Sequence, residues 1–189
     1  MPEMRTKKYM PSTFLIAFPL LIVSLRVFPD TPSFNRPYVS SSSDGSCYLK
    51  AVPAGPDGVR GTTKIFRVER GADAELLSFN WYSRRTFIFC GVNVGGNLKT
   101  VVVRFTPSHS GHIASERDAA FEIFHDKRKV STISTLALAE TSDNVLQTFS
   151  HYFSTQSVQP VFSDGVPSIE VVTNDGRTLR LDLISGKIE

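Results

Sequence analysis

The chain has 189 residues, of which 41% are hydrophobic and 11% aromatic, and its 21 basic and 18 acidic side chains give a net charge of +3. This length suits one ordinary domain, and unremarkable contents of Gly and Pro without a fixed repeat exclude collagen-like, disordered and solenoid proteins. Four of the basic residues but only one acidic residue lie in residues 1–26, so the rest of the chain carries 17 of each sign. The excess charge therefore belongs to the N-terminal segment, and we expect no nucleic-acid partner.

An N-terminal hydrophobic leader is predicted over residues 1–28. Three cations precede the apolar run Phe14–Leu25, a layout typical of a cleaved signal peptide. At about 1.5 Å per residue this run reaches about 18 Å, which is short of the roughly 30 Å hydrocarbon core of a bilayer. Residues 9–28 alternatively form an uncleaved anchor in the inner membrane, since no Ala-x-Ala site follows and Arg26 stands where small residues are expected. Both interpretations predict a periplasmic, secreted or anchored protein that meets the membrane only through this segment.

A linker is predicted over residues 29–46, because three Pro and six Ser among 18 residues offer little surface to bury. The remaining residues, 47–189, are expected to form a single domain.

Short segments rich in β-branched and aromatic residues fill this domain, which is the pattern of strands. The predicted strands are residues 48–52, 64–69, 75–82, 86–92, 100–106, 119–125, 129–134, 169–173 and 178–183. Polar turns at Thr173–Arg177 and within Phe124–Val130 predict two hairpins. The expected fold is mainly β, an antiparallel β-sandwich or twisted two-sheet domain with minor helix.

One segment, residues 143–155, fits two structures. Val145, Leu146, Phe149, Tyr152 and Phe153 have helical spacing, and Ser142 or Asp143 could cap a helix. The content of β-forming residues also suits a strand, but we favour a short helix or turn here. A second short helix is expected over Thr135–Glu140.

The strongest cluster of reactive side chains is a loop containing His109, His112 and Glu116. A His-x-x-His spacing with a nearby carboxylate could bind a metal, but the His-Glu-x-x-His helix of zinc enzymes is absent. A polar loop between two strands explains the same residues. We therefore expect no catalytic residue, metal or cofactor, and keep these three side chains as the candidates for a metal site.

Cys47 and Cys90 are the only cysteines. In an exported domain they could pair, which would close a large loop. Alternatively Cys90, in an apolar strand, is a small buried side chain and Cys47 is free.

Several short strings spread from Ser43 to Gly186 together resemble a family of exported bacterial proteins of unknown function. They are Trp81-Tyr82, Val102-Val-Arg-Phe105, Ser134-Thr-Leu136, Asp143-Asn-Val145, Ser150-His-Tyr152 and Asp175-Gly-Arg-Thr178 with Asp182. The resemblance implies export and one compact domain, and it assigns no catalytic residue. It also implies that a Cys47–Cys90 disulfide would be specific to this chain.

The sequence favours a non-catalytic binding or cell-envelope structural module, whose partner would be a cell-envelope protein or polysaccharide. The alternative is an exported hydrolase or metal-dependent enzyme that uses the His109/His112 loop.

Overall fold

The computed structural model describes residues 35–55, 60–163 and 165–189. The predicted leader, residues 1–28, lies outside the described residues. Within the described part strands are the main secondary structure, and the one helix is the short α1 (Thr135–Ala139). The predicted mainly β fold is confirmed.

The first four strands form an antiparallel sheet, the N-terminal sheet, in the order β1-β2-β3-β4. Its strands are β1 (Tyr38–Ser41), β2 (Cys47–Pro53), β3 (Gly61–Arg67) and β4 (Ala74–Phe79). Alternate residues of β2, namely Cys47, Leu49 and Ala51, are fully buried, because successive side chains of a strand point to opposite faces. One face of this sheet therefore packs on the core.

The next sheet, the central sheet, has the strand order β5-β6-β8-β9. Its strands are β5 (Arg85–Val94), β6 (Asn97–Phe105), β8 (Ala119–His125) and β9 (Arg128–Ser134). Strand β6 carries four consecutive buried residues, Thr100 to Val103. A run without alternation indicates a strand that is covered on both faces.

The last four strands form the C-terminal sheet, in the order β12-β13-β14-β15. Its strands are β12 (Thr155–Ser163), β13 (Val166–Thr173), β14 (Thr178–Asp182) and β15 (Lys187–Ile188). A small sheet of β7 (His109–Ser110), β10 (Leu146–Gln147) and β11 (His151–Phe153) lies beside α1 and has the order β10-β11-β7.

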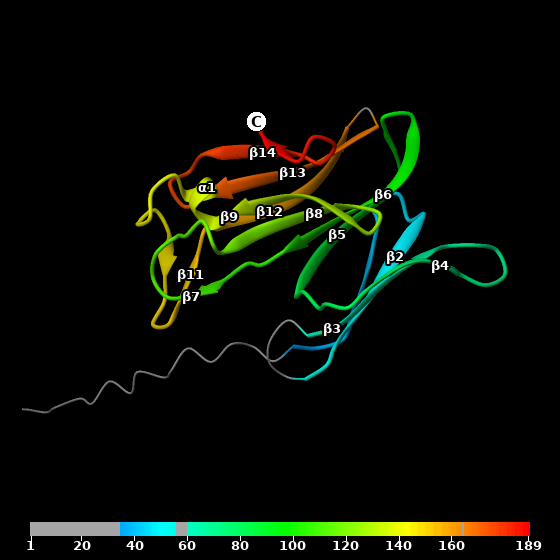
Figure 1. Ribbon diagram of the computed structural model, residues 1–189, viewed down its shortest axis with the longest axis horizontal. Coiled ribbons are helices and arrows are strands. Elements are labelled where there is room, and N and C mark those ends of the chain that lie inside the picture. Colours follow the sequence, from blue (N-terminus) through cyan, green and yellow to red (C-terminus); the bar gives the residue numbers. More distant parts are fainter. Residues whose placement is uncertain (1–34, 56–59, 164) are drawn as a thin grey trace, which may run out of the picture.

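Three layers result, with the central sheet in the middle (Figure 1). Phe89, Val101 and Val103 pack with residues of the C-terminal sheet in one apolar cluster. Ile88 and Val102, which alternate with them, pack with the N-terminal sheet in a second cluster. The fold is thus sandwich-like, as expected, with a third sheet on the outer face.

A disulfide joins two of the layers. Cys47 of β2 is bonded to Cys90 of β5, 43 residues later in the chain. The sequence left pairing and free thiols as alternatives, and the structure contains the bond. Disulfides persist in oxidising compartments, so this bond suggests an extracytoplasmic environment.

Two sequence predictions were wrong in detail. Of the alternatives for residues 143–155, the helix does not form: the segment contains turns and two short strands, since β10 and β11 pair as a hairpin and β11 also pairs with β7. Of the five apolar residues with helical spacing, only Tyr152 is fully buried, whereas Leu146 and Phe149 are 61% and 70% exposed. The domain also begins before residue 47, because residues 38–41 of the predicted linker form β1, which pairs with β2.

Other predictions were confirmed. Helix α1 lies within the second predicted helix, with the Ser134 hydroxyl accepting from the Ala137 N–H as a cap. The turns after β8 and after β13 form the two predicted hairpins. Within the described residues no helix is long and apolar enough to cross a membrane.

We expect the double variant Cys47→Ala/Cys90→Ala to lose about 3 to 4 kcal/mol of unfolding free energy, because the bond closes a loop of 43 residues in the unfolded chain. Urea unfolding of both proteins, with and without reductant, measures this loss. Reductant should destabilise the native chain to the level of the variant and leave the variant unchanged. An unchanged native midpoint under reduction would contradict the expectation.

Candidate functional site

The three metal candidates from the sequence bind different partners. The His112 ring lies with Nε2 3.1 Å from the Phe149 carbonyl oxygen, and Glu116 accepts a hydrogen bond from the Ser134 hydroxyl. His109 instead stacks on Tyr152, with ring centres 5.6 Å apart. Within the described part of the chain no three His, Cys, Asp or Glu side chains are grouped as metal ligands would be.

His109 borders a buried polar network that the sequence did not reveal. The phenol of fully buried Tyr152 donates to Asp118 Oδ2 at 2.5 Å and lies 2.9 Å from the Thr135 hydroxyl. The Thr135 hydroxyl in turn accepts from the Ser115 N–H. These contacts tie the loop after β7 to α1 and β11, so the network holds the small sheet in place.

Burial decides the protonation of the two rings. Burial, together with the hydrogen bond to Asp118, raises the pKa of Tyr152 to about 12. Burial also lowers the pKa of His109, outweighing the opposite effect of the nearby Asp118 carboxylate. Both side chains are therefore neutral at pH 7, which suits a structural cluster better than an acid–base pair.

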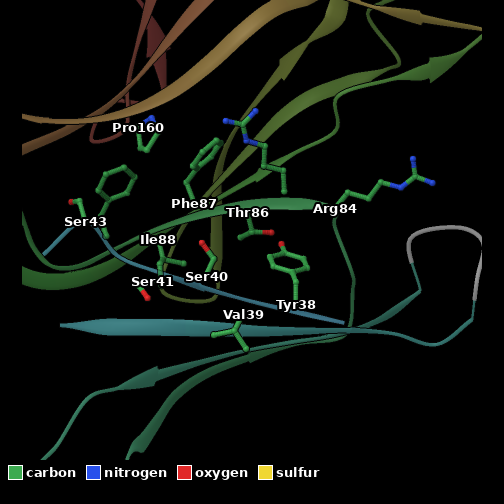
Figure 2. Close-up of a pocket in the computed structure, with 12 residues that line it drawn as sticks. Tyr38, Val39, Ser40, Ser41, Ser43, Arg84, Thr86, Phe87, Ile88 and Pro160 are labelled. Atoms are coloured by element: carbon green, nitrogen blue, oxygen red, sulfur yellow. The ribbon is translucent and has the colours of Figure 1, made fainter. Parts of the chain in front are cut away.

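A groove of about 400 Å³ lies between β1 and β5 (Figure 2), and none of its lining residues belongs to this cluster. Strand β5 is an edge of the central sheet and β1 is an edge of the N-terminal sheet, so two strand edges face the same space. Pro160 of β12 adds a contribution from the C-terminal sheet. The N-terminal, central and C-terminal sheets therefore all border the groove.

Hydroxyl groups dominate the side of the groove that β1 forms. Tyr38 and Ser40 point toward β5, whereas Val39 points away from it (Figure 2). Ser41 and Ser43 also line the groove. The groove wall on this side can thus donate and accept hydrogen bonds along its length.

Two hydroxyls in the groove have unmet hydrogen-bonding capacity. The Thr86 side chain, 3% exposed, points toward the Tyr38 phenol (Figure 2). Neither oxygen makes a well-formed hydrogen bond within the described residues, although the two hydroxyls are close enough for Thr86 to affect the pKa of Tyr38. Burial, partly offset by the neighbouring Thr86 hydroxyl, raises the pKa of Tyr38, so the phenol stays protonated. Unpaired buried polar groups are uncommon and call for a physical explanation.

Arg85 brings a positive charge to the groove. Arg84 and Arg85 both line it, and no carboxylate is among its described lining residues. Arg85 donates from Nη2 to the Val158 carbonyl at 2.6 Å, and its guanidinium lies 5.0 Å from the centre of the Phe87 ring. Among the described residues Arg85 has no carboxylate partner. Its remaining N–H groups could bind an anion.

Sequence reasoning missed this groove for two reasons. One wall consists of residues 38–43, which the Pro- and Ser-rich composition assigned to a linker. The other consists of β5, which was correctly predicted as a strand, although its position at a sheet edge depends on pairing between distant segments. A row of Ser next to a Tyr in an extended segment was the one local signal.

Comparison of the chain with known protein families, with curated proteins and with solved structures finds no match.

The Tyr152 network makes a prediction about alkaline pH. Because the folded-state pKa of about 12 lies above the usual value of 10, the protonated phenol contributes stability below pH 10 that is lost as the pH rises toward 12. Tyr152→Phe should therefore cost about 1 to 3 kcal/mol at pH 7, and the gap to the native protein should narrow above pH 10.

Urea unfolding of both proteins at pH 7, 9, 10.5 and 11.5 measures this gap, and taking the difference removes the effects of other tyrosines. A gap that stays constant over this range would contradict the assigned role of the Tyr152 hydroxyl.

Proposed function

We propose that this protein is a non-catalytic binding module outside the cytoplasm, and that it holds an extended ligand in the groove between β1 and β5. The observation that carries the proposal is the groove itself, where two open strand edges, unpaired hydroxyls and Arg85 border one space. Grooves that combine apolar walls with a few polar groups are common binding sites.

The compartment is supported by two independent features. The Cys47–Cys90 disulfide is of the kind that persists in oxidising surroundings. The N-terminal segment has the layout of a signal peptide, or of an anchor over residues 9–28. Within such a compartment the partner would be a cell-envelope protein or polysaccharide, presented as an extended chain.

The alternative function, an exported hydrolase or metal-dependent enzyme, gains no observation from the described residues. His109, His112 and Glu116 each contact different protein groups. The binding function is therefore the one that the geometry supports best.

Binding in the groove can be tested with neighbouring substitutions on one strand. Ser40→Trp places a large ring between β1 and β5, whereas Val39→Trp is the control, because the Val39 backbone borders the groove but its side chain, 63% exposed, points away from β5. On an array of short peptides and oligosaccharides the native chain and Val39→Trp should retain the same ligands, and Ser40→Trp should lose them. Equal retention by both variants would exclude the groove as the site.

Export can be tested apart from binding. Residues 1–34 fused to alkaline phosphatase should give an active enzyme, because this reporter needs disulfides that form outside the cytoplasm. A matched fusion with Leu20→Arg should be inactive, since a charge in the apolar run opposes its insertion. An inactive native fusion would contradict export.

A further inference from the structure

The part of β5 that borders the groove is an open strand edge. Residues Arg85 to Phe89 pair with Phe105 to Val101 of β6 on one side. No strand of the described residues pairs with the other side. In an antiparallel ladder half of the backbone N–H and C=O groups of an edge strand point away from its neighbour. The outer edge of β5 can therefore accept another strand.

Residues 86–89 of this edge contain neither a proline nor a charged side chain, which are features that protect two other edges of the fold. Pro160 removes an N–H from edge strand β12, and β9, the opposite edge of the central sheet, begins with Arg128 and Lys129. Beyond Phe89, β5 is itself interrupted by a bulge that includes Gly91 at φ +68°. Residues 86–89 consist of Thr, Phe, Ile and Phe, which are strong strand formers.

The groove matches an extended peptide better than a sugar. Sugars bind largely by stacking on open aromatic faces, but the three aromatic rings that line the groove already have partners. Phe89 stacks on Phe162 at 6.3 Å, the Arg85 guanidinium lies over Phe87, and Tyr38 packs edge-on against Tyr82. By contrast, backbone groups repeat every two residues along β5, which is the spacing that a second strand offers.

The positive charge of Arg85 indicates which kind of peptide the groove would bind. Arg85 begins the open edge, has no described carboxylate partner, and lies in a groove lined by arginine and hydroxyl groups without an acidic residue. A guanidinium held in place by a backbone carbonyl and an aromatic ring is well placed to bind a carboxylate.

We infer that the groove binds a short extended peptide that carries a carboxylate, that the peptide adds as a strand to the outer edge of β5 at residues 85–89, and that Arg85 binds the carboxylate. This inference rests on the proposed function and specifies its ligand. About five peptide residues, some 17 Å of strand, would cover this edge.

The experiment uses the full chain with its disulfide formed and labelled with nitrogen-15. Three blocked peptides serve as probes: Thr-Val-Glu-Val-Thr, the same peptide with Gln in place of Glu, and the Glu peptide N-methylated at every residue, so that neither of its edges can donate a backbone hydrogen bond. The oligosaccharide probe is tetragalacturonate, which carries carboxylates without a peptide backbone. Chemical shifts of the amides of residues 85–89, followed during titration, give the affinity for each probe.

We expect the Glu peptide to bind about tenfold more tightly than the Gln peptide, and the N-methylated peptide not to bind. Arg85→Gln should remove the preference for Glu and leave affinity for the Gln peptide unchanged, and Arg85→Lys should keep part of the preference. Because the Gln peptide monitors the integrity of the groove, a structural effect of the substitution is distinguished from loss of the carboxylate contact.

The remaining outcomes separate the two proposals. Equal affinity for the Glu and Gln peptides would overturn the role of Arg85, and binding of the N-methylated peptide would overturn strand addition. Binding of tetragalacturonate at residues 85–89 without peptide binding would overturn the peptide ligand and keep the groove as a binding site. If no peptide or sugar in these titrations or on the array is retained through the groove, both proposals fail.

Discussion

The requirement that the central sheet be covered on both faces determines the rest of the structure. Its strands alternate side chains into two separate apolar clusters, so that Val102 packs on one side and Val101 and Val103 on the other. Neither outer sheet could bury its own apolar face without this shared middle layer. A sheet covered on both faces can meet a ligand only at its edges, and β5 is one of those edges. The candidate site therefore follows from how the core is built.

The disulfide connects this constraint to the groove. Cys90 lies on β5, and Cys47 lies on β2, which pairs directly with β1. The bond thus holds the N-terminal sheet, whose β1 forms one groove wall, to β5, which forms the other wall. Additional links close the other end of the groove, where β1 and β5 begin, since Tyr82 donates to the Arg36 carbonyl and Arg84 donates to the Asn35 side chain. A preformed groove spares a ligand the entropy cost of ordering its site, which favours binding.

The sequence predicted the local structure better than the pairing. Strands such as β8 and β13 have dense β-forming residues, and the turn at Asp175-Gly176 is specified by residues that tolerate its backbone angles, with Gly176 at φ +84°. Strand β12 was missed because it is polar, contains Pro160 and fully buries only Val158. The helix favoured for residues 143–155 was wrong because most of the helically spaced apolar side chains are not buried, and pairing of β11 with β7 stabilises a strand instead. Edge positions, and with them the groove, depend on contacts between distant segments that periodicity does not encode.

The two buried polar clusters, one around Tyr152 and one in the groove, differ in whether their hydroxyls are paired. Around Tyr152 each hydroxyl is paired, and the unpaired Nε2 of His109 is tolerated because burial keeps the ring neutral. Such a network stabilises the loops that it joins and has no hydroxyl left for a ligand. In the groove the Tyr38 and Thr86 hydroxyls are buried without partners, beside an arginine without a described carboxylate. An unpaired buried hydroxyl costs about 1 to 3 kcal/mol, a cost that a bound ligand or water can reduce. Because the cost lies where an open strand edge and a positive charge meet, it is best explained as part of a binding site.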